Sequence, residues 1–263
     1  MEDSNILNAL LHYMKGCEPF LISFKTLLRD SKNWCPFTHG EKINLNCYKS
    51  NPAVLSLLAW TEKYVFCCKF LDANRYMIDE MNVIIIELKS PESLVYYEEF
   101  QSKTKRVREL IGFLEKDILN KLSRISCKEC ARLDEALVCF QNYCFYASIV
   151  MAVSAVESRI HELIRKADKK IYSSRLEKFT LGRLIQIFDE NQYTSKEFAS
   201  IKKLMPNKHR PLIALLNQYR VFSAHPKEEK ITAQIAESVL HLAFNFMMDE
   251  SVCPYSKKEL SCH

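Results

Sequence analysis

An arginine and a histidine stand five positions apart in the stretch NQYRVFSAHPKEE, residues 217–229, directly before a proline. Arg220 carries a permanent cation whose planar fork matches phosphate oxygens. His225 can take up and release a proton near neutral pH. Pro226 cannot continue a helix, so both side chains are expected near a helix end. The pattern indicates half of a phosphate-handling site. A plain helix terminus, in which the His225 ring bonds to free carbonyl groups, would use the same residues.

A carboxylate earlier in the chain offers this arginine a partner. Glu157 follows a segment that is apolar almost all the way round a helix, which predicts the central helix of a bundle. A carboxylate in such a place needs a cation, and Arg220 can supply it while holding two helices in register. An ion pair of this kind is compatible with a phosphate site.

Basic residues gather in the same half of the chain. The net charge of the whole chain is +5, and between Arg159 and Lys230 there are 16 Lys and Arg against 8 Asp and Glu. Such runs are usually solvated surface. Here the excess surrounds the Arg220 and His225 stretch, where a polyanion would need it.

Composition narrows the class of protein. The 263 residues include only four glycines, too few for the tight turns of a sandwich, a barrel or a doubly wound fold. No glycine-rich nucleotide loop is present, so we expect no nucleotide cofactor of the Rossmann or P-loop kind. No apolar run is long enough to span a membrane, and the N-terminus does not resemble an export signal. We therefore expect a cytoplasmic protein with reduced cysteines.

Helical periodicity divides the chain into two regions. Residues 1–125 are expected to form a mainly helical region of unknown role, with a loop over 30–52 and a strand or buried helix around 82–87. A regular apolar repeat predicts a helix over 101–124. Residues 126–263 are expected to form an antiparallel helical bundle, so the predicted fold is all-α.

Within the second region, several boundaries can be read from single residues. Two helices are expected to separate near Asn142, and Thr180 is expected to cap the helix that begins LGRLIQIF. Pro211 suits the first turn of the helix that carries Arg220. His209 lies in the charged run NKHRP and is expected at the surface, as is His161.

Three stretches, in this order, resemble the HEPN superfamily over about residues 130–250. They are YASIVMAVSAVESRIHELI, FTLGRLIQIF and LLNQYRVFSAHP, and the last is similar to the family's Arg-x4-6-His signature. The resemblance is to prokaryotic members of uncharacterised function. It implies a helical bundle that dimerises and, in active members, a metal-independent endoribonuclease, as in prokaryotic defence or toxin-like systems.

The resemblance also assigns roles to residues. It implies that Arg220 and His225 are catalytic and that Glu157 begins the family's Glu-x3-Lys-x3-Arg element, which ends at Arg165. His161 stands where that element has lysine. A polar residue often follows the arginine in active members, whereas this chain has Val221.

The leading hypothesis is a homodimer that cuts RNA, with Arg220, His225 and Glu157 at the dimer cleft and without a cofactor. The alternative is a non-catalytic module for dimerisation or for binding a nucleotide or nucleic acid. Cys127 and Cys130 supply half of a zinc site, and no second pair has the matching spacing, so we assign no metal.

Overall fold

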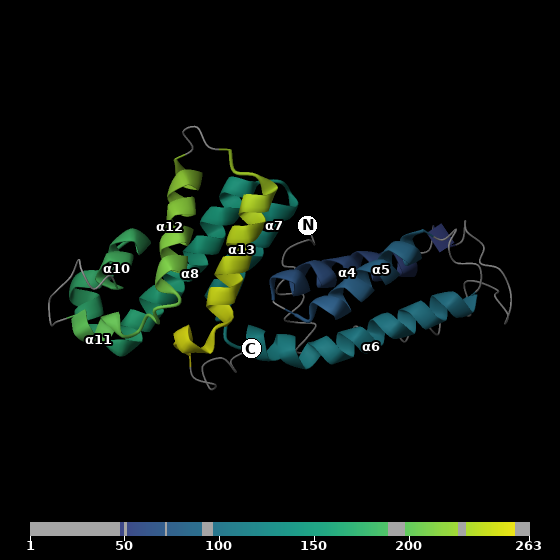
Figure 1. Ribbon diagram of the computed structural model, residues 1–263, viewed down its shortest axis with the longest axis horizontal. Coiled ribbons are helices and arrows are strands. Elements are labelled where there is room, and N and C mark those ends of the chain that lie inside the picture. The colour runs from purple at the N-terminus through teal and green to yellow at the C-terminus, as the bar shows by residue number, and fades with distance from the viewer. Residues whose placement is uncertain are drawn as a thin grey trace. The chain divides into compact units, whose positions relative to one another are not determined.

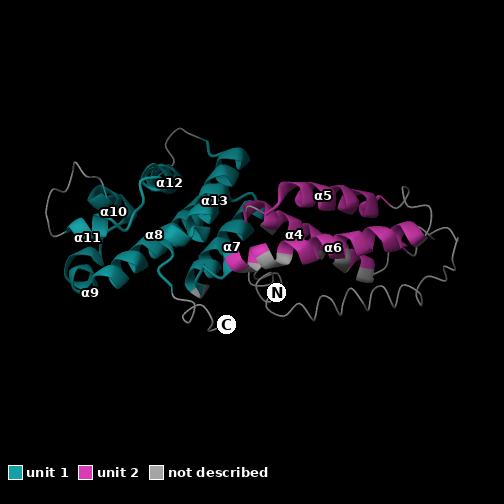
Figure 2. Ribbon diagram, turned by 60° about the horizontal axis from the view of Figure 1, so that its bottom comes forward, with its two compact units in different colours: residues 1–8, 121–263 teal, residues 9–120 magenta. Residues whose placement is uncertain are grey.

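The computed structural model describes residues 48–49, 52–71, 73–90, 97–188, 198–225 and 230–255. These residues form helices and contain no strand, so the predicted all-α fold is confirmed (Figure 1). The chain divides into two compact units, here called unit 1 (residues 1–8 and 121–263) and unit 2 (residues 9–120) (Figure 2).

Unit 2 contains helices α4 (Pro52–Phe70) and α5 (Arg75–Lys89) and all but the last two residues of α6 (Tyr97–Leu122). The segment that could have been a strand, around 82–87, lies inside α5, whose buried residues recur at helical spacing: Ile78, Met81, Ile84, Ile85 and Leu88. Most of the loop predicted over 30–52 falls outside the described residues. Within it Tyr48, Lys49 and Pro52 are helical, so the loop prediction is wrong there.

Helix α6 matches its prediction closely. The apolar repeat that predicts it is buried at every position: Val107, Leu110, Ile111, Leu114, Ile118 and Leu122. Ion pairs connect its polar flank to α5, where Arg106 binds Glu80 with two parallel bonds of 2.6 and 3.0 Å. The apolar stripe and the ion pairs therefore orient α6 against α5.

Unit 1 is a bundle around α8 (Phe145–Ala167), which packs against α7 (Cys127–Gln141), α12 (Arg210–Ala224) and α13 (Ala233–Met248). Small buried residues on α8, among them Ser148, Ala152 and Ala155, allow this close packing. Shorter elements complete the unit: α9 (Lys169–Ile171), the π-helix η2 (Tyr172–Leu176), α10 (Leu181–Phe188), α11 (Ala199–Lys202) and the 3-10 helix η4 (Glu250–Val252).

The break between α7 and α8 is a Schellman turn. Asn142 is the C-cap of α7, the Cys144 N–H donates to Cys139 O at 2.8 Å, and the Tyr143 N–H donates to Phe140 O at 3.1 Å. Tyr143 has φ 61°, in the left-handed region where glycine is favoured. The predicted separation near Asn142 is confirmed.

A buried ion pair joins α7 and α8 in this bundle. The Arg159 side chain of α8 and the Glu129 side chain of α7 are both fully buried. Two parallel bonds join them, from Arg159 Nε to Glu129 Oε1 at 2.7 Å and from Arg159 Nη2 to Glu129 Oε2 at 2.8 Å. Burial by itself would lower the pKa of Arg159, but the bonds and charge of Glu129 raise it. The arginine is therefore a fixed internal cation.

Both partners of this pair also bind backbone. Arg159 donates to the carbonyl oxygens of Met247 at 3.0 Å and Arg124 at 2.8 Å, which belong to the end of α13 and the turn before α7. Glu129 accepts from the Ser126 N–H at 2.8 Å, which completes a capping box at the start of α7. The pair thus joins three parts of the unit that are distant in sequence.

We expect Arg159→Met to lower the free energy of unfolding by about 3–5 kcal/mol, because it leaves the Glu129 carboxylate buried without a counter-charge. The matched control is Arg106→Met, which breaks an equally bidentate but half-exposed pair and should leave stability close to that of the parent. Urea unfolding followed by far-ultraviolet circular dichroism measures both. Equal losses in the two variants would contradict the importance of the buried pair.

Candidate functional site

The candidate site lies along α12 and the neighbouring part of α8. Pro211 occupies the first turn of α12, as expected, and the helix ends at Ala224 with His225 as its C-cap. The His225 backbone N–H closes the last turn by donating to Val221 O at 3.0 Å. Arg220 therefore lies inside the final turns of the helix, and His225 lies at its end.

Glu157 and Arg220 form an ion pair, as the sequence predicts. Arg220 Nη1 lies 3.0 Å from Glu157 Oε2, and the two side chains are 24% and 20% exposed. The pair is therefore partly open to solvent. No other bond of the Arg220 guanidinium is present among the described residues, so its remaining N–H groups are available to a ligand.

The same carboxylate also holds the start of α10. Glu157 Oε1 accepts the backbone N–H of Leu181, the first residue of that helix, at 2.5 Å. Thr180 holds the N-cap position of α10, as the sequence predicts, and its backbone oxygen accepts the first helical bond, from the Leu184 N–H at 3.0 Å. The carboxylate from α8 adds a bond to the N–H of the first helical residue. α10 and α12 approach closely in the same turn, where a Cβ at Gly182 would make an ordinary contact, 3.4 Å from the Asn217 side chain.

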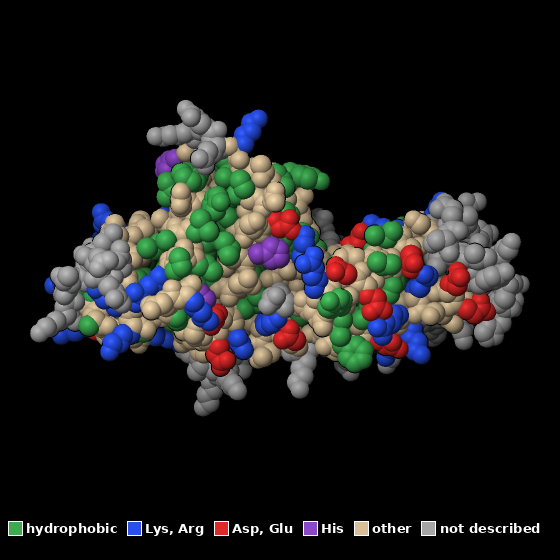
Figure 3. Space-filling model, in the orientation of Figure 1, with side chains coloured by type: hydrophobic (Ala, Val, Ile, Leu, Met, Phe, Trp, Pro, Cys, Tyr) green, Lys and Arg blue, Asp and Glu red, His purple; other side chains and the backbone are tan. Residues whose placement is uncertain are grey.

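His225 projects from α12 in a different direction from Arg220, so it lies away from the Glu157–Arg220 pair. Five residues correspond to about 140° at 3.6 residues per turn, so Arg220 and His225 project in different directions from α12. The His225 side chain is exposed, and it follows an exposed apolar face that includes Val221 and Leu215, 44% and 40% exposed. Figure 3 shows hydrophobic side chains gathered over α12 and α13 on this side of unit 1. Within one chain, the described structure joins Arg220 to Glu157 and leaves His225 apart.

The other residues of the Glu157 element have separate partners. His161 accepts or shares a hydrogen bond with the Tyr172 hydroxyl, its Nδ1 lying 3.2 Å from that oxygen. Burial lowers the pKa of His161, and the nearby Glu157 charge opposes this shift only in part. Arg165 pairs with Glu162 on its own helix, at 2.5 and 2.8 Å. Of this element, Glu157 is therefore the residue that contacts Arg220.

A second polar cluster, missed in the sequence, surrounds His209. This residue is only 5% exposed, so its predicted surface position is wrong. Its Nε2 lies 3.1 Å from Asp249 Oδ2, and its ring packs edge-on against Phe246. Although burial raises the pKa of Asp249, bonds from Lys208 and Ser251 lower it well below its usual range. Burial lowers the pKa of His209 more than Asp249 raises it.

The cysteine pair gives no support for a metal site in the described residues. Cys130 is buried in the first turns of α7. The side chain of Cys127 lies outside the description. Among the described residues no three His, Cys, Asp or Glu side chains are grouped as metal ligands.

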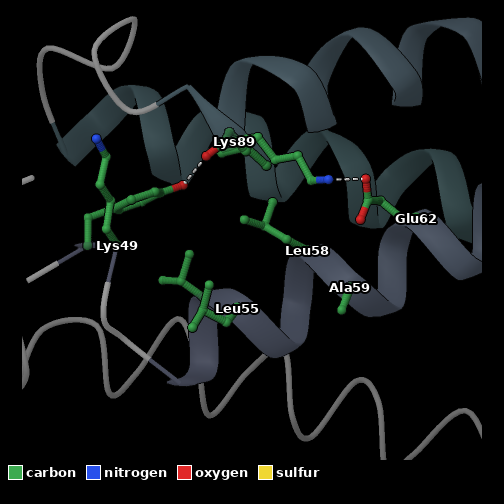
Figure 4. A pocket seen from close by; sticks show the side chains of 9 residues that line it. Lys49, Leu55, Leu58, Ala59, Glu62 and Lys89 are labelled. Carbon is green, nitrogen blue, oxygen red and sulfur yellow. Dashed lines mark hydrogen bonds and ion pairs between the residues drawn. The ribbon is translucent and has the colours of Figure 1, made fainter. Parts of the chain in front are cut away.

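A cavity of about 300 Å³ lies in unit 2 between α4 and α5 (Figure 4). Leu58 and Leu88 form part of its wall, and its polar groups are already paired: Lys89 with Glu62, and the Tyr48 hydroxyl with Leu88 O at 2.7 Å. We find no catalytic arrangement in these groups.

Comparisons with protein-family models, with curated proteins and with solved structures find no match to this chain. Among the described helices, none combines the length and apolar character needed to cross a membrane. The site must therefore be interpreted from its own geometry.

We expect Glu157→Ala to remove the acceptor of the Leu181 N–H and to lower the free energy of unfolding by about 1–3 kcal/mol. Glu157→Gln keeps an acceptor oxygen while removing the charge, so its loss should be clearly smaller. Hydrogen-exchange NMR of the Leu181 amide tests the cause directly. The amide should lose protection in the alanine variant and keep it in the glutamine variant, and loss in neither would contradict the proposed contact.

Acidification should weaken the cluster around His209. A histidine with a lowered folded pKa takes up its proton more readily in the unfolded chain, so stability falls as pH drops through the unfolded value of about 6.5. Asp249, also lowered, loses its contribution only at more acidic pH. We expect His209→Gln, which keeps an N–H donor, to flatten the slope of stability between about pH 7 and about pH 5. Unfolding midpoints at several pH values measure this, and an unchanged slope would rule it out.

Proposed function

We propose that this chain is a HEPN-like protein that acts on RNA as a metal-independent endoribonuclease, with Arg220 and His225 at a dimer cleft. The observation that supports the proposal most is the contact of Arg220. Among the described residues, one bond to Glu157 holds the Arg220 guanidinium, and its remaining N–H groups can bind a phosphate. The exposed His225 ring at the end of the same helix supplies a group for proton transfer.

The chemistry requires three functions. A base removes the 2′-hydroxyl proton, an acid protonates the leaving 5′-oxygen, and a cation stabilises the charge that develops on phosphorus. His225 suits either proton transfer, and Arg220 suits the third function. Glu157 serves as a positioning residue, because one of its oxygens is bound by Arg220 and the other by Leu181.

One chain provides too few groups, which is the reason for proposing a dimer. A single histidine cannot be base and acid at once, and it lies about 140° around the helix from Arg220. Two copies related by a twofold axis would bring two of each residue into one cleft. The exposed apolar face that contains Leu215 and Val221 and continues to His225 fits such an interface. On this hypothesis Val221 belongs to the dimer contact.

One observation favours a second candidate, a non-catalytic module that binds a nucleotide or nucleic acid. Glu157 already compensates the charge of Arg220, so a phosphate must compete with a carboxylate for that arginine. In this case α12 would serve dimerisation and binding alone.

We expect RNA cleavage to persist in EDTA and to leave a 2′,3′-cyclic phosphate. His225→Ala should reduce kcat by roughly 100-fold or more, and Arg220→Lys should also reduce it, because lysine lacks the bidentate fork. His241→Ala, on α13, is the matched control and should cut at the parental rate. If folded His225→Ala cuts as fast as the parent, the site assignment is wrong. Salt-sensitive binding without cleavage would select the module instead.

The dimer has its own test. Val221→Asp places a charge on the exposed face of α12 and should convert a dimer to a monomer in light scattering, with loss of cleavage. Ile86→Asp, at a more exposed apolar position on α5, is the control and should leave the oligomeric state unchanged. A parent that is monomeric at micromolar concentration would rule out the composite site.

A further inference from the structure

A marked charge imbalance lies beside the site, at the α9–α11 end of unit 1. Residues 165–210 contain twelve Lys and Arg against five Asp and Glu, an excess of seven that is larger than the net charge of the whole chain. Figure 3 shows several Lys and Arg side chains around this end of unit 1. The described part of this segment holds eleven of the basic residues and two of the acidic ones.

Several of these cations have no acidic partner in the described part of the chain. Lys208 pairs with Asp249 and Arg165 with Glu162, and the Asp168 carboxylate is used to cap α9 by accepting the Ile171 N–H at 2.9 Å. Among the described residues, the side chains of a further group make no ion pair or hydrogen bond, and we call this group the basic surface: Lys169, Lys170, Lys178, Arg183, Lys202 and Lys203. Like charges on one surface repel one another, and a bound anion would relieve this repulsion.

The basic surface lies at one end of unit 1. The elements that carry it, α9, α10 and α11, are grouped there in Figure 2, and α9 and α11 both contact α8. The π-helix η2 lies between Lys170 and Lys178 in the chain, and π-helical turns of this kind often occur at functional sites. The surface also begins next to the candidate site, because the first residue of α10, Leu181, is bound by Glu157.

Its composition indicates the kind of anion. None of the large exposed hydrophobic residues of the described structure lies between 165 and 210, so the surface has no side chain to insert into a lipid layer. Arg183 has its Cζ 5.7 Å from the centre of the Phe179 ring, which holds a flat cation at the surface. Spaced lysines with a flat arginine suit phosphates in series and an unpaired base.

We propose that the basic surface binds the backbone of a single-stranded RNA whose neighbouring segment lies at the Arg220 site. This inference rests on the proposed function for the identity of the strand. The surface contributes affinity through phosphate contacts and leaves the chemical step to Arg220 and His225.

The test uses a 2′-O-methyl RNA of roughly 16 nucleotides, which has no free 2′-hydroxyl and therefore reports binding without cleavage. Lys170→Gln with Lys203→Gln should weaken binding roughly 10-fold at low salt and reduce the slope of log K against log salt by about 1.4, for two lost phosphate contacts. The control is Lys105→Gln with Lys128→Gln, two exposed lysines that belong to other helices. This double variant should change neither quantity.

Each outcome decides the inference. Equal weakening by both double variants, no binding by the parent at about 50 mM salt, or tighter binding to anionic vesicles than to RNA would overturn it. Cleavage of RNA with free 2′-hydroxyl groups distinguishes a failure of this inference from a failure of the proposed function. If the Lys170→Gln, Lys203→Gln double variant raises KM for a long RNA with kcat unchanged, the inference and the proposed function both stand. If RNA binds through the surface and the parent cuts nothing, the inference stands and the catalytic proposal fails.

Discussion

The buried contact between Arg159 and Glu129 fixes the position of α8, and the other helices of unit 1 are placed relative to it. Removing two charges from water is expensive, and their attraction offsets this only when the remaining donors and acceptors are satisfied. Here the arginine also binds carbonyl oxygens at the end of α13 and before α7, and the carboxylate also binds the first turn of α7. Two apolar side chains could fill the same space, but they could not bind the end of α13 or the first turn of α7 and so would not fix their positions.

The central helix connects this structural pair to the candidate site. Arg159 and Glu157 are two residues apart, or about 200° around a helix, so they project to opposite sides of α8. One side is held to α7 and α13, and the other side holds α10 and α12 through Leu181 and Arg220. Because α8 is anchored on its buried side, the Glu157 carboxylate has a defined position from which to orient Arg220.

The sequence predicts the parts of this arrangement that depend on local pattern. The repeat in α6, the turn at Asn142 and the pairing of Glu157 with Arg220 could be read directly. The Arg159 pair could not, because Glu129 looks like an ordinary surface residue and nothing in its local pattern marks it as buried. The surface position predicted for His209 is wrong for the same reason. This residue lies in a charged run, and its burial depends on Phe246 and Asp249, which come much later in the chain.

Electrostatics separates the two parts of the proposed RNA contact. Arg220 is paired with a carboxylate, so the candidate site itself adds little long-range positive potential. The unpaired lysines of the basic surface do add it, and their field attracts a polyanion before any specific contact forms. An arginine that is oriented but partly compensated can then discriminate at short range, where geometry rather than net charge decides which phosphate it binds. On this view affinity and chemistry are carried by different residues of one unit, and salt should affect the first far more than the second.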